Sequence, residues 1–260
     1  ESAAYFLSTP PDNAAARAPG RIPHQATVSD VRGSEDHLRL DEQGVIFVKH
    51  QAPAIDFYDS AQVEADYYPQ VQRLVQEQTG CSEVFVFDHN VRNKALVNDD
   101  FEVNRVAVQN PVKSVHNDYT EVSGPQRVRD FLPERAEELI NGRFAMINVW
   151  RPISGPVRQT PFAVIDADSI EFDDFIPIDL VYSDRIGQIY MVKHNASHRW
   201  IYMSEMNTDD VMLLKCFDSS TEINARYTAH SAFEIPRDDQ GQELPERESI
   251  EVRTLVFFRD

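Results

Sequence analysis

Short apolar runs separated by turn residues dominate the second half of the chain and predict β-strands. Residues 143–153 (RFAMINVWRPI) and 210–219 (DVMLLKCFDS) are typical, because each is a nearly continuous apolar run of strand length next to turn residues. Several short strands at this spacing indicate a mainly β fold, either a sandwich or a barrel. The strands expected from the pattern are residues 44–50, 82–90, 143–153, 160–170, 187–195, 198–206, 210–219, 225–235 and 249–258.

Two stretches carry helical spacing instead. Within residues 60–80, Val71 and Leu74 recur at a helical interval, and Gly80 supplies a C-terminal stop. Residues 123–143 predict a broken helical pair, because a proline is tolerated in a first helical turn and a glycine ends the second piece. The expected class is therefore mainly β with some helix (α+β), with the helices beside the strands.

Length and composition favour one folded domain. The chain has 260 residues, of which 42% are hydrophobic and 26% charged, so it can bury a core without disulfide or metal staples. We expect a single domain over residues 1–260. Residues 1–43 show little periodicity and are expected to form an extended N-terminal arm.

The charge balance argues against two classes of partner. A formal net charge of −18 opposes binding to the phosphates of nucleic acid and to anionic membrane surfaces. Two cysteines without CxxC spacing fit a reducing compartment, and no signal-peptide pattern or long apolar run is evident, so a cytoplasmic location is expected. The expected partner is a small molecule, and the oligomeric state stays open.

A histidine and an aspartate two positions apart, in the segment SVHNDYTEV, suggest a metal site. His116 and Asp118 face the same side if this segment is a strand. A second histidine from another strand would complete a 2-His-1-carboxylate facial triad, which leaves positions open on non-heme Fe(II). His230 is the expected third ligand, because a jelly roll can fold a late strand back beside an early one. His194 and His198 are read as loop histidines, since Asn-Ala-Ser between them indicates a turn.

The last predicted strand, RESIEVRTLVFF, has four polar side chains on one face. Arg247, Ser249, Glu251 and Arg253 alternate along it. One interpretation is a salt-bridged outer face. The other is an inner face, on which Arg247 makes a bidentate pair with a dicarboxylate co-substrate and Ser249 adds a hydroxyl hydrogen bond. Arg253 is the rival anchor, or a residue that holds a substrate carboxylate.

The strand INVWRP offers candidate substrate-binding residues. Asn148 and Trp150 lie on one face of it, and we expect them to line the cavity; plain core packing is the alternative for Trp150. Arg151 is a candidate for attracting an anionic substrate, although arginines are most often on the surface.

These blocks together resemble a known family. VHNDYT, RFAMINVWRPISGPV, HRWIYMSEMNTDDVMLLKCFDS, HSAF and RESIEVRTLVF are similar to the fungal hydroxylase/desaturase family related to gibberellin desaturase and cephem methoxylase, within the Fe(II)/2-oxoglutarate-dependent oxygenase superfamily. The resemblance covers residues 100–258 and is less distinct before them.

The resemblance implies a fold and a reaction. The fold is a double-stranded β-helix (jelly roll) with flanking helices. Fe(II) would be bound by His116, Asp118 and His230, and 2-oxoglutarate would chelate the metal. Its decarboxylation by O2 would drive hydrogen abstraction from a C–H bond of a small specialised metabolite, which leads to hydroxylation, desaturation or ring formation.

A second hypothesis comes from another class of protein. A cupin-like, metal-binding jelly roll would act as an isomerase or as a ligand-binding module without 2-oxoglutarate turnover. The two hypotheses differ at the arginines: the co-substrate has no anchor if neither Arg247 nor Arg253 faces the metal cavity.

Overall fold

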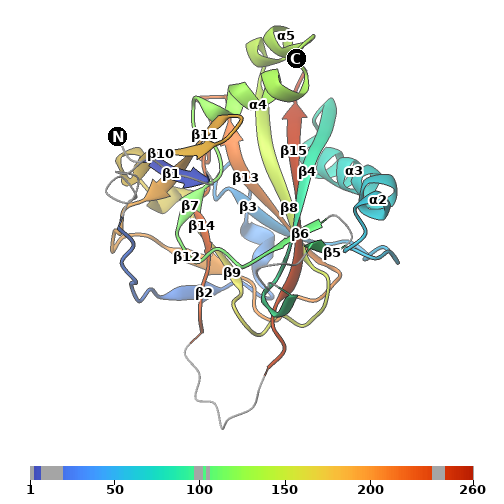
Figure 1. The fold of residues 1–260 in the computed structure, drawn as a ribbon. Coiled ribbons are helices and arrows are strands. Elements are labelled where there is room, and N and C mark those ends of the chain that lie inside the picture. Colours follow the sequence, from blue (N-terminus) through green and yellow to red (C-terminus); the bar gives the residue numbers. More distant parts are fainter. Residues whose placement is uncertain (1–2, 7–19, 97–101, 104–105, 236–243, 260) are drawn as a thin grey trace.

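Two β-sheets form the body of the molecule in the computed structural model, which describes residues 3–6, 20–96, 102–103, 106–235 and 244–259 (Figure 1). The first sheet has the strand order β3-β13-β8-β15-β4-β6-β5. Its strands are β3 (Val45–Lys49), β13 (Asp210–Asp218), β8 (Phe144–Pro152), β15 (Glu248–Phe257), β4 (Glu83–Asn93), β6 (Val106–Gln109) and β5 (Glu102–Val103).

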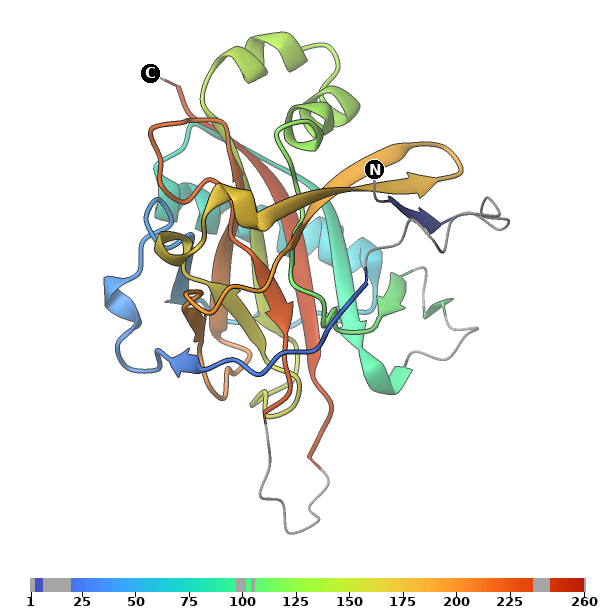
Figure 2. The ribbon, with the colours of Figure 1, turned by 90° about the vertical axis from the view of Figure 1, so that its left-hand side faces the viewer.

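The second sheet has the order β1-β10-β11-β7-β14-β9-β12-β2. Its β10–β11 hairpin extends away from the body of the molecule (Figure 2). The strands are β1 (Ala3–Phe6), β10 (Phe175–Tyr182), β11 (Ile186–Val192), β7 (His116–Asn117), β14 (His230–Ala232), β9 (Phe162–Ile165), β12 (Trp200–Tyr202) and β2 (Val28–Asp30).

Strand β8 shows how the two sheets share a core. Met146 and Trp150 pack in a cluster with Val164 and Tyr190 of the second sheet, so they lie between the sheets. Ile147 and its odd-numbered neighbours pack in a separate cluster on the outer face. Because β8 is buried on both faces, its sequence reads as a continuous apolar run. The facing sheets form the double-stranded β-helix, and the expected mainly β class is confirmed.

Helices cover the outer face and one end of the first sheet (Figure 1). Helix α3 (Tyr68–Thr79) packs Val71 and Leu74 on that face and ends at Gly80, whose φ is 67°. It follows α2 (Ser60–Gln62) and the π-helical turn η2 (Val63–Tyr67). The other helical segments are η1 (Glu35–His37), η3 (Lys94–Leu96), α4 (Ser123–Phe131), α5 (Ala136–Asn141), η4 (Ala167–Ser169) and η5 (Phe172–Asp174). Across the part of the chain that the structure describes, no helix is long and apolar enough to cross a membrane.

Several strands differ from the sequence prediction. Strand β14 spans only His230–Ala232 of the expected residues 225–235, because residues 225–229 form no ladder with a neighbouring strand. Strand β4 continues to Asn93 rather than ending at residue 90, because it pairs with β15 over its whole length. Strand β10 was not expected, since its partly exposed residues and Pro177 weaken the strand pattern.

Candidate metal centre

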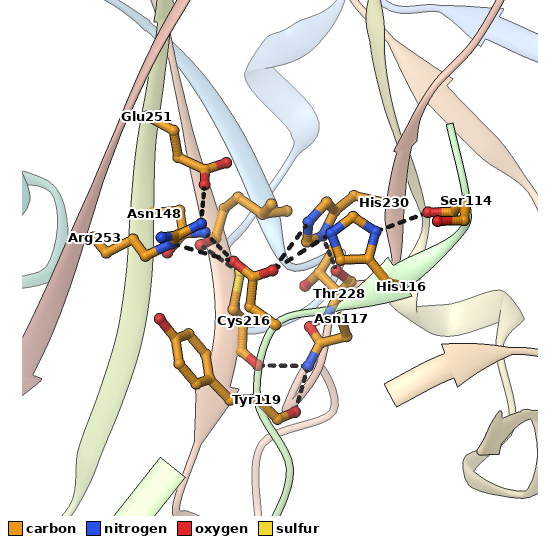
Figure 3. Close-up of polar contacts among 12 residues, drawn as sticks. Ser114, His116, Asn117, Tyr119, Asn148, Cys216, Thr228, His230, Glu251 and Arg253 are labelled. Carbon is orange, nitrogen blue, oxygen red and sulfur yellow. Dashed lines mark hydrogen bonds and ion pairs between the residues drawn. The ribbon is translucent and has the colours of Figure 1, made fainter. Parts of the chain in front are cut away.

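Three side chains converge where β7 meets β14. His116 lies directly opposite His230 in the antiparallel ladder, and Asp118 follows β7 by one residue. One oxygen of the carboxylate, Asp118 Oδ1, lies 3.5 Å from His116 Nε2 and 3.9 Å from His230 Nε2. The three ligand atoms lie within 4.8 Å of one another (Figure 3). Cross-strand pairing thus brings together two residues that are 114 positions apart in the sequence.

Backbone carbonyls orient both imidazole rings. His116 Nδ1 lies 2.8 Å from the carbonyl oxygen of Ser114, and His230 Nδ1 lies 3.0 Å from that of Thr228. Each Nδ1–H donates to its carbonyl, so each Nε2 keeps its lone pair pointed at the centre of the triad. This is the tautomer that a neutral histidine needs in order to bind a metal.

The ionisation states also suit a cation. Burial and then the neighbouring His116 lower the pKa of His230 to about 4, so this ring is neutral at pH 7. Burial raises the pKa of Asp118, but His116 and the guanidinium of Arg253 outweigh burial and hold this pKa well below its usual range. An ionised carboxylate and neutral imidazole form the donor set typical of non-heme Fe(II).

Asn117 fixes the two histidine strands from behind. Its Nδ2 donates to the carbonyl oxygens of Tyr119 (2.7 Å) and Cys216 (2.9 Å), and its Oδ1 accepts from the backbone N–H of Thr228 (3.1 Å). The side chain is fully buried. Asn117 was not predicted from the sequence. The available signal was its polar side chain at the position between His116 and Asp118, which alternation along a strand turns toward the core.

A second polar group lies on the far side of Asp118. Asn148 Nδ2 donates to Asp118 Oδ2 at 2.8 Å, and Arg253 Nε lies 3.7 Å from the same oxygen (Figure 3). The Arg253 guanidinium also pairs with Glu251 (3.1 Å) and Asp88 (2.9 Å). The structure thus places Arg253 beside the candidate metal ligand Asp118.

A small cavity opens onto the triad. Arg247 is 3% exposed and lines this cavity, where its Nη1 donates to the carbonyl oxygen of Thr160 (2.7 Å). Among the described residues, Arg247 Nε and Ser249 Oγ have no hydrogen-bond partner. The lining residues are Arg92, Val112, His116, Asp118, Phe162, His230, Ser231, Ala232, Arg247 and Glu251.

These two buried polar atoms fit the end of a dicarboxylate. An unpaired buried donor carries a desolvation cost of about 1–3 kcal/mol, which a carboxylate oxygen would remove. Burial and the nearby charge of Arg92 lower the pKa of Arg247 to about 9, so the guanidinium is still protonated at pH 7. Arg247 and Ser249 are therefore donors that suit a carboxylate.

Arg92 is a cavity residue that the sequence reasoning missed. Its Nη1 donates to the carbonyl oxygen of Asn110 at 2.7 Å. It lies in β4 beyond residue 90, where the expected strand ended, and the alternating pattern around Val91 was the available signal.

The remaining candidates lie elsewhere. Trp150 packs under Arg247, with the guanidinium carbon 5.6 Å from its ring centroid. Arg151 lies on the opposite face of β8, fully buried against the helix side, where its Nη2 donates to the carbonyl oxygen of His50. The structure does not bring Arg151 to the cavity, because odd positions of β8 point outward. His194 and His198 are in a loop away from the triad, and His198 contacts Asp174.

Comparison with known proteins points to one family. A family model described as an oxidoreductase/YMDC permease-like domain matches residues 1–257. The α-ketoglutarate-dependent dioxygenase phiK of Fungal sp. (strain ATCC 74256) is 33% identical over 89% of this chain and 83% of that protein. Hydroxylase/desaturase efuI of Hormonema carpetanum is 33% identical over 90% of this chain and 83% of its own length.

A solved structure is also similar over nearly the whole chain. The iron and α-ketoglutarate-dependent endoperoxidase NvfI has a TM-score of 0.82 and 28% identity, and the match covers 98% of this chain and 94% of that one. The dioxygenase nvfI of Aspergillus novofumigatus is 30% identical over 97% of this chain and 90% of that protein. The chain therefore belongs to the fungal hydroxylase/desaturase family of Fe(II)/2-oxoglutarate-dependent dioxygenases, oxidoreductases that use Fe(II), 2-oxoglutarate and O2.

Proposed function

We propose that this protein oxidises a C–H bond of a small natural-product intermediate, with Fe(II) held by His116, Asp118 and His230. The observation that carries the proposal is the convergence of three ligand atoms within 4.8 Å at the wall of a cavity. Bound Fe(II), with 2-oxoglutarate and O2, supplies the oxidising chemistry. The protein holds the ligands, binds the co-substrate and positions the substrate carbon.

We assign the distal carboxylate of 2-oxoglutarate to Arg247 and Ser249. Both side chains are buried, Arg247 directly before β15 and Ser249 within it, and each carries an unpaired polar atom. Trp150 supports the guanidinium from below. An arginine held in this way can form a charge-assisted, bidentate pair with a carboxylate.

The substrate is proposed to enter past an apolar wall. Phe162 stacks on the ring of His230 at a centroid distance of 5.2 Å, and Val112 and Ala232 line the same cavity. Asn148 and Trp150 act on the site indirectly, through Asp118 and Arg247 respectively. Hydroxylation, desaturation and ring formation all start from the same hydrogen abstraction, and the placement of the substrate carbon decides among them.

We also propose that the chain works as one domain. The described part of residues 1–43 supports this, because β1 and β2 pair in parallel with β10 and β12. Arg32 adds an ion pair to Asp210, the first residue of β13, at 3.2 Å.

An anaerobic titration tests the function. Adding Fe(II) and then 2-oxoglutarate to the wild-type protein should produce the weak visible charge-transfer band of the chelate, and His116→Ala and His230→Ala should abolish it. His194→Ala is the matched control, since this loop histidine lies outside the triad, and its band should equal that of the wild type. A wild-type protein without the band, and without succinate formation under air, would favour the cupin-like alternative.

The co-substrate site has its own test. Arg247→Ala removes a charge-assisted hydrogen-bonding group of about 1.5–3 kcal/mol, so the Kd of 2-oxoglutarate should rise roughly 10- to 150-fold. Arg158→Ala is the control, because Arg158 is an exposed arginine that pairs with Glu205. An unchanged Kd for Arg247→Ala would reject the assignment.

A further inference from the structure

The two oxygens of the Asp118 carboxylate have different surroundings. Oδ1 faces the Nε2 atoms of both histidines, at 3.5 and 3.9 Å. Oδ2 faces away from them, accepts a hydrogen bond from Asn148 (2.8 Å) and lies 3.7 Å from Arg253 Nε. The protein's own donors thus engage one oxygen and leave the other for a metal.

The sheet register fixes the groups around Oδ2. Arg253 lies opposite Asn148 of β8 on one side and opposite Asp88 of β4 on the other. Its guanidinium pairs with Asp88 at 2.9 Å and with Glu251 at 3.1 Å. The carboxylates of Asp88 and Glu251 therefore hold the Arg253 guanidinium in place. The guanidinium in turn lies against a third carboxylate, that of Asp118.

We propose that Arg253 and Asn148 clamp Oδ2 of Asp118, so that this carboxylate offers a single oxygen to the iron. The inference rests on the proposed role of the triad. Three single-atom ligands leave three positions of a six-coordinate ion, which are two for the chelating co-substrate and one for O2. A carboxylate that bound through both oxygens would take one of those positions.

The clamp gives Arg247, the residue before β15, and Arg253, within β15, different tasks. Arg247 lines the cavity, whereas Arg253 is absent from its lining. Their Cα atoms are separated by six residues, roughly 20 Å along a strand at about 3.3 Å per residue. Arg253 is therefore a positioning residue that acts through Asp118, and the structure favours Arg247 over Arg253 as the co-substrate anchor.

Metal binding without co-substrate tests the clamp. Co(II), which reports its coordination number in its visible absorption, is titrated into wild type, Asn148→Ala and Arg253→Met. Partners that orient a metal ligand typically contribute about 10- to 100-fold in metal affinity. Both variants should raise the Kd of Co(II) by about that factor and change the intensity of the Co(II) bands, and Arg253→Lys should partly restore both.

Arg247→Met is the matched control, because this variant removes the other arginine of the same strand face. It should leave the affinity for Co(II) and the Co(II) spectrum unchanged and should weaken the binding of 2-oxoglutarate. If Arg253→Met instead weakens the binding of 2-oxoglutarate and leaves Co(II) binding as in wild type, Arg253 anchors the co-substrate. The clamp is then rejected.

Two further outcomes separate the clamp from the function itself. Arg253→Met leaves Glu251 without its ion-pair partner, so it can fail to fold; Asn148→Ala then decides, and Co(II) binding equal to wild type overturns the clamp. If the wild type binds Co(II) no better than His116→Ala does, the triad is not the metal site, and the proposed function falls with the clamp.

Discussion

At the residue scale, the metal centre depends on an amide that touches no ligand atom. Asn117 lies between His116 and Asp118 and points to the other side of β7, where its side chain forms hydrogen bonds with three backbone groups. One of them is the N–H of Thr228, whose carbonyl oxygen orients His230. A single buried side chain therefore links both halves of the triad.

Replacing Asn117 should cost both stability and metal affinity. Asn117→Ala leaves three buried backbone groups without partners, at about 1–3 kcal/mol for each group that water does not reach. We expect a clear drop in the urea midpoint of the metal-free protein and weaker Co(II) binding. Ser114→Ala is the control, because Ser114 orients His116 through its backbone carbonyl, which the substitution keeps. Equal midpoints for Asn117→Ala and wild type would contradict this role.

At the element scale, the turn before β3 supports β14 and its histidine. Gly44 has a φ of 82°, and a Cβ placed there would lie 2.0 Å from Thr228 Oγ1. Thr228 in turn donates to the carbonyl oxygen of Gly44 at 3.3 Å. The close approach of the Thr228 side chain to this backbone, together with the positive φ, requires glycine at this position.

Gly44→Ala and Gly33→Ala form a matched pair. Both positions have a φ of 82°, but a Cβ at Gly33 would meet no atom within 4 Å. The left-handed conformation alone costs about 1–2 kcal/mol, and overpacking adds about 1–3 kcal/mol. We therefore expect Gly44→Ala to lose more stability on chemical unfolding than Gly33→Ala, and to weaken Co(II) binding as well. A similar loss for both variants would mean that Thr228 moves aside freely.

Several elements could be predicted from local pattern alone. The apolar runs of β8 and β13 and the end of α3 at Gly80 lie where the sequence placed them. Strand β10 could not, because its residues are partly exposed and its pairing with β11 makes it a strand. The end of β4 was missed, and Arg92 with it, because its polar residues interrupt the apolar run and only pairing with β15 extends the strand.

At the scale of the whole molecule, the two sheets share one core. Trp150 packs between the sheets, whereas Trp200 lies in β12, next to β2 of the N-terminal arm. The cavity lies between strands of both sheets, since β15 carries Glu251, with Arg247 just before it, and β14 carries His230. Neither sheet could form the site without the other.

Unfolding should therefore be a single cooperative event. Trp150→Phe leaves the fluorescence of Trp200 as the reporter of the second sheet, and Trp200→Phe leaves Trp150 as the reporter of the core. In each variant the fluorescence transition in urea should coincide with that of far-UV circular dichroism, as expected for one domain. A fluorescence transition of Trp200 at a lower urea concentration than the circular dichroism transition would show that β12 and the arm unfold separately.

The sequence by itself determined the strand-rich class, the spacing of His116 and Asp118 and the polar face of the last strand, because alternation along a strand is a local property. Only the tertiary structure decided which histidine meets that pair and which arginine faces the cavity. Arg247, directly before β15, lies at the cavity, whereas β15 carries Arg253 to Asp118, and the odd positions of β8 carry Arg151 away from both. Cross-strand register and the neighbours of each strand set these contacts, and no local pattern contains them.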